Sequence, residues 1–183
     1  MDLEKLQYPI GKFQYSGEIT KRVIDGWIDE IAALPQKLRM TVENLTEEQL
    51  NTQYRPDGWT IRQVVHHLAD SHLNSLIRFK LSLTEETPTI RPYFEDRWAE
   101  LPDYRLVPLE TVLNFLDHLH EMWLILLRSL NEKDLARQFY HPESNEHIDL
   151  ATNIGIYAWH CRHHLAHITT LIEKKGWKTD SLP

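Results

Sequence analysis

Cysteine is almost absent from the 183-residue sequence. Its single cysteine, Cys161, excludes an intramolecular disulfide and a zinc site built from several thiolates. A metal ion on this chain would therefore need nitrogen or oxygen ligands. The N-terminal residues mix acidic, basic and apolar side chains and form no secretory signal, so we expect a cytoplasmic protein in a reducing compartment.

Long apolar runs and an excess of positive charge are also missing. No apolar run approaches the roughly 20 residues that a membrane-spanning helix needs. The 20 Lys and Arg residues are outnumbered by 27 Asp and Glu residues, which gives a net charge of -7. Such a chain has little attraction for phosphate backbones or anionic lipid. We therefore expect no nucleic acid and no membrane as partners, and a small-molecule substrate or a protein partner instead.

Four segments carry apolar side chains at the three- and four-residue spacing of an amphipathic helix. They span about residues 17–44, 60–83, 108–130 and 150–175, and Pro35 is expected to bend the first or divide it into two segments. No convincing network of strands accompanies them. The pattern predicts an all-α four-helix bundle in a single domain over residues 1–183.

Two of the connections between these helices are distinctive. Residues 84–107 contain Pro88, Pro92 and Pro102 and no sustained apolar period, which predicts a long connection with one short helix near residues 95–100. Residues 138–149 alternate around Pro142 and predict a short hairpin or an irregular loop before the fourth helix.

Histidine is the outlier of the composition, with 11 copies. The fourth helix carries two pairs at a spacing of four, His160 with His164 and His163 with His167. At about 100° per residue, His160 and His164 lie on the shoulder of the apolar stripe that contains Cys161, whereas His163 and His167 point away from it, toward water. Helical phase therefore favours His160 and His164 as metal ligands and predicts that Cys161 is buried and inert.

A third imidazole could come from the second helix. His72 falls within the apolar stripe of that helix, while His66 and His67 lie on its two flanks, and phase alone does not choose between them. His67 shares its flank with other polar side chains, as a pocket between helices requires. The remaining histidines are expected to decorate the third helix or to lie in loops, outside a metal site: His118, His120, His141 and His147.

The residue after His160 is Cys161, so the glutamate of an HExxH metallopeptidase is missing. Three neutral imidazoles leave an open position on a metal ion, where the pKa of water falls to about 7 or a thiol binds as thiolate. Hydrolysis needs a general base from elsewhere, whereas a bound thiolate needs none. The unranked candidates for such a base are Asp70, Asp117 and Glu121, and Arg78 is a candidate for receiving an anionic substrate.

Several segments resemble the YfiT proteins of the DinB/YfiT superfamily. They are residues 8–11, 57–72, 78–88 and 157–167. The resemblance implies a four-helix bundle, a homodimer, and one divalent metal ion on His67, His160 and His164, and it thereby selects His67 over His66. Zinc is the ion we expect, with nickel as the alternative, because imidazole suits both.

The resemblance also implies an enzyme, with two reactions left open. YfiT-type proteins are described as metal-dependent hydrolases, while related members of the superfamily use bacillithiol or mycothiol in S-transfer or isomerisation. We expect the metal to activate water or bacillithiol toward an electrophilic small molecule, and the missing base favours thiol S-transfer. The competing hypothesis is a non-catalytic metal-binding or protein-interaction bundle.

Overall fold

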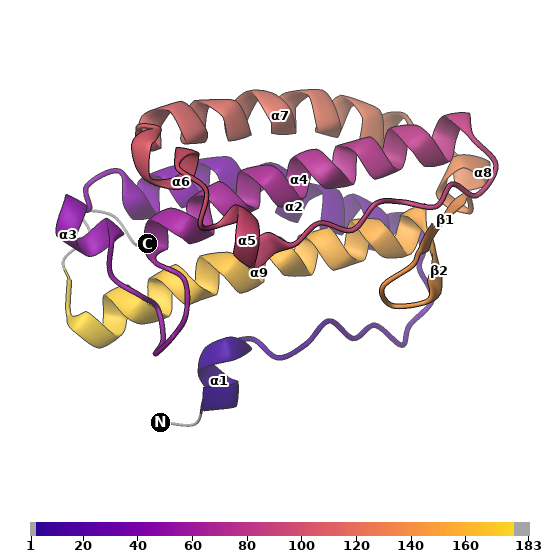
Figure 1. Ribbon diagram of the computed structural model, residues 1–183. Helices are drawn as coiled ribbons and strands as arrows, with labels where there is room; N and C mark the ends of the chain where they lie inside the picture. The colour runs from indigo at the N-terminus through magenta and orange to yellow at the C-terminus, as the bar shows by residue number, and fades with distance from the viewer. Residues whose placement is uncertain (1–2, 178–183) are drawn as a thin grey trace.

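The computed structural model describes residues 3–177, in which four long helices dominate (Figure 1). These are α2 (Lys21–Val42), α4 (Ile61–Thr84), α7 (Leu109–Ser129) and α9 (Leu150–Lys175). The connections hold short elements: α1 (Leu3–Gln7), α3 (Glu47–Leu50), α5 (Glu95–Trp98), α6 (Asp103–Leu106), α8 (Glu132–Leu135), β1 (Gln138–His141) and β2 (Glu146–Asp149). The predicted all-α four-helix bundle is confirmed, and the two ends of the predicted domain lie outside the described residues.

The order of the helices around the bundle differs from the order along the chain. α2 packs against α7 and α9, and α4 packs against the same two helices. α2 and α4 therefore occupy opposite corners, and the chain crosses the bundle diagonally from α2 to α4 and again from α7 to α9. Fully buried side chains from all four helices, among them Ile31, Leu68, Trp123 and Ile154, form one apolar core that holds the helices together.

Local sequence fixes where the helices begin and end. The Thr60 hydroxyl accepts a hydrogen bond from the Gln63 amide, and the Gln63 side chain accepts one from the Thr60 amide, which makes a capping box for α4. Asp149 caps α9 in the same way through the Thr152 amide. Gly176 ends α9 with a left-handed φ of 64°, which suits glycine.

The first long helix departs from expectation at both Gly17 and Pro35. It begins at Lys21 because the Thr20 side chain caps it by accepting a hydrogen bond from the Val23 amide. It then continues through Pro35 without interruption, so the predicted division into two segments is wrong. Proline cannot donate a hydrogen bond to the carbonyl four residues earlier, that of Ile31.

The long connection and the hairpin are confirmed, but the long connection holds two short helices where one was predicted. The connection formed by residues 85–108 is long and contains α5 and α6. Of these two helices, α6 packs on α4. β1 and β2 form the antiparallel hairpin, so His141 and His147 lie on strands rather than in loops.

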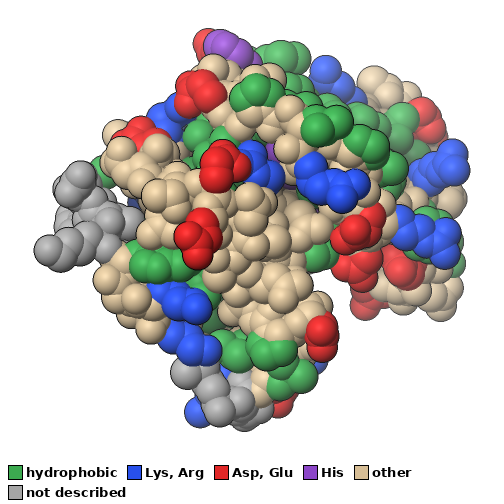
Figure 2. All heavy atoms as spheres, turned by 60° about the vertical axis from the view of Figure 1, so that its left-hand side comes forward, with side chains coloured by type: hydrophobic (Ala, Val, Ile, Leu, Met, Phe, Trp, Pro, Cys, Tyr) green, Lys and Arg blue, Asp and Glu red, His purple; other side chains and the backbone are tan. Residues whose placement is uncertain are grey.

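The surface carries charges of both signs. On the face shown in Figure 2, acidic and basic side chains are interspersed, and the described residues there form no continuous basic patch. Within residues 3–177, none of the helices is long and apolar enough to span a bilayer.

Candidate metal centre

Three of the predicted side chains come together where α4 packs on α9. His67 lies in the second turn of α4, and His160 and His164 lie one turn apart on α9. One ring nitrogen of each lies within 4.8 Å of the others, and the Nε2 atoms of His67 and His160 are 3.2 Å apart. Two nitrogens on a tetrahedral zinc ion, each at 2.0–2.1 Å, are about 3.4 Å apart.

The burial and the protonation state of these three imidazole rings suit the binding of a cation. His67 and His164 are buried, at 6% and 7% exposure, and His160 is partly buried. Burial, reinforced by the neighbouring imidazoles, lowers the pKa of His67 to about 3 and the pKa values of His160 and His164 well below their usual range. Neutral rings offer lone pairs. Within residues 3–177, the buried Nδ1 atoms of His67 and His164 have no hydrogen-bond partner. The donor set therefore fits a divalent cation held by three imidazoles.

His160 also has buried partners on the side away from His67. Its Nδ1 lies 3.3 Å from Nε2 of His72, and Nδ1 of His72 lies 2.7 Å from Nε2 of His120. His72 is fully buried, as predicted, but His120 is only 1% exposed and does not decorate the surface. The sequence did contain the signal, because His120 follows Leu116 by four residues and precedes Trp123 by three, on the apolar face of α7.

His163 and His167 contradict the prediction that they meet water, because they are only 7% and 4% exposed. The Nε2–H of His167 donates to the Gln7 carbonyl, and its ring stacks on Tyr54 at 4.0 Å. Helical phase missed this burial because the covering residues are distant in sequence. With His164, these two rings form a second group of nitrogens within 4.8 Å, so the neighbouring pair needs its own control in any metal-binding experiment.

A pocket of about 450 Å³ opens beside His67 and His164; His163 and His167 also line it, but His160 does not. His67 and His164 line it together with Tyr54 and Trp59, whose ring lies 4.5 Å from that of His67. Its remaining lining includes the exposed carboxylates Asp57, Glu95 and Asp96. A larger cavity of about 830 Å³, near α8, is lined by no histidine and is therefore not the metal site.

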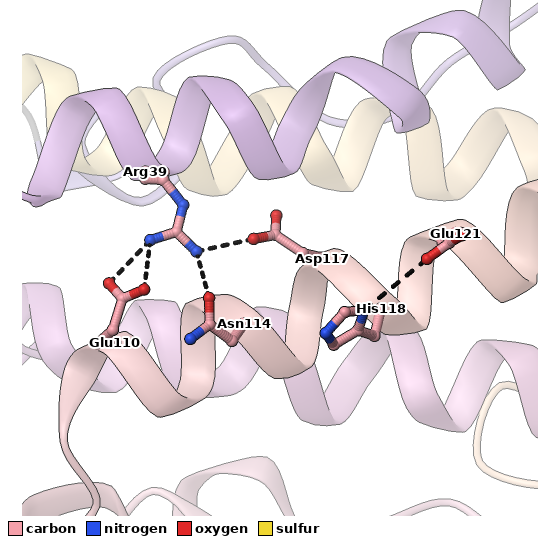
Figure 3. A network of polar contacts seen from close by, with 6 residues as sticks. All are labelled: Arg39, Glu110, Asn114, Asp117, His118 and Glu121. Carbon is pink, nitrogen blue, oxygen red and sulfur yellow. Dashed lines mark hydrogen bonds and ion pairs between the residues drawn. The ribbon is translucent and has the colours of Figure 1, made fainter.

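The proposed general bases do not contact the ligand histidines. Asp117 pairs with Arg39 at 2.7 Å and Glu121 with His118 at 3.7 Å, both on α7, as Figure 3 shows. Asp70 accepts a hydrogen bond from the Tyr104 hydroxyl at 2.6 Å.

Two hydroxyl groups and the guanidinium group of Arg78 lie closer to the three histidines than these carboxylates do. The Ser71 hydroxyl is 3.5 Å from Nε2 of His160 and 3.3 Å from the Tyr157 hydroxyl. The positive charge of Arg78 contributes to lowering the pKa of His160, and none of the ion pairs within residues 3–177 includes Arg78. Ser71 and Arg78 lie on the polar flank of the second helix that the sequence indicated.

The sequence is similar to those of known proteins. Residues 30–168 match the family model of the DinB superfamily. A protein of Oceanobacillus iheyensis is 56% identical over 93% of this chain and 98% of its own length, and one of Bacillus mycoides is 55% identical over 96% and 100%. Both are named "putative metal-dependent hydrolase".

A solved structure is similar as well. YfiT from Bacillus subtilis, described as a probable metal-dependent hydrolase with an unusual four-helix bundle topology, superposes with a TM-score of 0.92 at 50% identity, over 95% of this chain and 99% of that one. The family match covers most of the chain, and the similarity to these relatives extends over nearly all of it. The chain belongs to the DinB superfamily.

Proposed function

We propose that this chain is a metal-dependent enzyme in which His67, His160 and His164 hold one divalent cation beside a substrate pocket. The observation that carries the proposal is the convergence of three neutral imidazoles from α4 and α9, two of them buried and one partly buried, on one point. Zinc suits three nitrogen ligands, with nickel as the alternative. Relatives of this chain are named as metal-dependent hydrolases, which supports a metal-dependent enzyme.

A cation bound there lowers the pKa of a water molecule or a thiol, so that either becomes a nucleophile near neutral pH. A water molecule must also give up its proton to a base, but the carboxylates lining the pocket are exposed, and those of Asp70, Asp117 and Glu121 are engaged elsewhere. We therefore favour S-transfer from a low-molecular-weight thiol such as bacillithiol. The charge of Arg78, which takes part in none of the ion pairs among the described residues, suits an anionic co-substrate of this kind.

In that reaction the thiol sulfur forms a bond to an electrophilic carbon, and the leaving group departs with its electron pair. The thiol proton passes to solvent. The Tyr157 hydroxyl donates to the Ser71 carbonyl, and the Ser71 hydroxyl lies 3.5 Å from Nε2 of His160, so this buried pair helps to hold α4 and α9 together at the site.

The test uses purified protein that is either loaded with zinc or stripped by a chelator. With bacillithiol and 1-chloro-2,4-dinitrobenzene, we expect thioether formation and chloride release that require zinc and disappear in His67→Ala. Thiol-independent cleavage of p-nitrophenyl acetate by the same zinc-loaded protein would favour hydrolysis instead. Bound zinc with neither reaction would favour the non-catalytic bundle, and zinc binding unaffected by His67→Ala would overturn the site itself.

A further inference from the structure

Pro35 leaves one carbonyl of α2 without its helical partner. The carbonyl of Ile31 lies four residues earlier and would normally accept a hydrogen bond from the amide at position 35, which proline lacks. This carbonyl instead accepts a hydrogen bond from Nδ1–H of His120 on α7, at 3.0 Å. A carbonyl can only accept, so the proton between these two atoms belongs to His120.

This position of the proton fixes the direction of the hydrogen bonds that link His120 to His72 and His72 to His160. With its proton on Nδ1, neutral His120 offers a lone pair on Nε2 to Nδ1–H of His72, 2.7 Å away. His72 then has a lone pair on its own Nε2, which accepts from Nδ1–H of His160 at 3.3 Å. The remaining nitrogen of His160, Nε2, therefore carries a lone pair, and it is the atom that lies 3.2 Å from Nε2 of His67.

We infer that His72 and His120, anchored on the Ile31 carbonyl, are positioning residues that hold His160 in the Nδ1–H tautomer and aim its Nε2 lone pair at the cation. The inference rests on the proposed metal site. Ligand histidines in proteins commonly donate their second N–H to such a partner, which fixes the ring and increases its basicity. Here the partner is a chain of two further imidazoles that ends on a backbone atom.

The same geometry argues against a path for protons. Both ring nitrogens of His72 and of His120 are engaged, and the chain ends at a carbonyl that cannot take up a proton. Two weaker contacts border it. The Sγ atom of Cys161 is 3.9 Å from Nε2 of His72, and the Ser71 hydroxyl is 3.5 Å from Nε2 of His160. The hydroxyl and the thiol can each donate or accept, so both fit the direction that the Ile31 carbonyl sets.

The first experiment compares two substitutions of His120. His120→Phe fills the same space but cannot accept the bond from His72, whereas the amide of His120→Gln can donate to Ile31 and accept from His72. We expect His120→Phe to bind zinc about 10- to 100-fold more weakly and His120→Gln to recover most of that loss. His118→Gln, an exposed position on the same helix, is the control for substitution as such.

The second experiment separates positioning from general stability. Pro35→Ala supplies an amide that competes for the Ile31 carbonyl, and it also removes an interior proline from a helix. We expect zinc affinity to fall while the melting temperature of the metal-free protein stays the same or rises. A merely structural role for Pro35 would move both quantities in the same direction.

Nitrogen-15 NMR of the histidine rings reports the tautomers directly, and it does so in the metal-free protein. We expect His160 to carry its proton on Nδ1 in the wild type and to lose this preference in His120→Phe. A wild-type His160 protonated on Nε2, or unchanged zinc affinity in folded His120→Phe, would overturn the inference. A protein with the expected tautomers that binds no zinc would instead refute the proposed function and leave the positioning chain intact.

Discussion

The three ligand imidazoles differ in what holds each ring. Nδ1 of His160 is bonded into a buried chain, whereas Nδ1 of His67 and Nδ1 of His164 have no partner within the described structure. A ring without a second partner gains its orientation from packing alone, as His67 does against Trp59. In the proposed metal site His160 is therefore the preorganised ligand, and the other two rings would be fixed by binding of the cation.

Adjacent residues of α9 offer a matched test of which histidines bind metal. His163 and His164 are both 7% exposed, so their replacement by alanine removes similar buried volume. We expect His164→Ala to reduce bound zinc from about one ion per chain to near background, and His163→Ala to retain it. Metal analysis after dialysis gives the answer. Loss of zinc in both variants would move the site to the group of His163, His164 and His167, because His164 belongs to both groups. Retention of zinc in His164→Ala would exclude both groups.

For the helices, local sequence signals predicted the ends correctly, whereas burial by residues that are distant in sequence was not predicted. The predicted start near residue 60 and the predicted bounds of 150–175 agree with α4 and α9, because the caps found there, Thr60, Asp149 and Gly176, depend on residues within one turn. Helical phase also placed His160 and His164 on the side of α9 where their ring nitrogens meet that of His67. The burial of His163 and His167 did not, because a segment more than 100 residues away covers them, as the bond from His167 to Gln7 shows. The choice of His67 over His66 came from family resemblance, since both flanks of α4 are buried.

The cap of α4 lies two turns from the metal ligand of that helix, which separates stability from metal binding. We expect Thr60→Ala to lower the free energy of unfolding by about 1 kcal/mol, because the side chain no longer accepts the hydrogen bond from the Gln63 amide. Zinc content should not change. Urea denaturation measures the first quantity, and Thr60→Ser, which retains the hydroxyl, should restore most of it.

For the whole molecule, the buried histidines make folding sensitive to acid. Burial lowers the pKa values of His66 and His120 to about 4, whereas these residues titrate near 6.5 in an unfolded chain. Between these values the unfolded chain binds more protons, so stability is greatest above pH 6.5 and is lost as the pH falls toward 4.

We expect the metal-free protein to lose about 1.4 kcal/mol per pH unit for each such histidine across this window. Urea denaturation at several pH values measures the slope. His120→Gln removes one titrating group and should make the slope shallower by about one proton. A free energy of unfolding that is constant from pH 7 to 5 would contradict this account.

Assembly of the molecule is a separate expectation, drawn from the resemblance to YfiT proteins, which predicts a homodimer. Phe115, Met122 and Ile125 lie on one face of α7 and are 45%, 57% and 71% exposed. We expect light scattering to give twice the chain mass of 21.7 kDa, and Ile125→Glu to give the monomer with unchanged helical circular dichroism. A wild-type monomer, or a dimeric Ile125→Glu variant, would exclude this face.

The indole of Trp59 gives the pocket a built-in optical reporter. Its ring lies 4.5 Å from the ring of His67 and 6.3 Å from that of His164, on the wall of the pocket. An ion with an unfilled d shell, such as Ni²⁺, quenches indole emission at short range, whereas Zn²⁺ does not. The difference in fluorescence between the two ions, lost in Trp59→Phe, would therefore follow occupancy of this site in real time and without any added label.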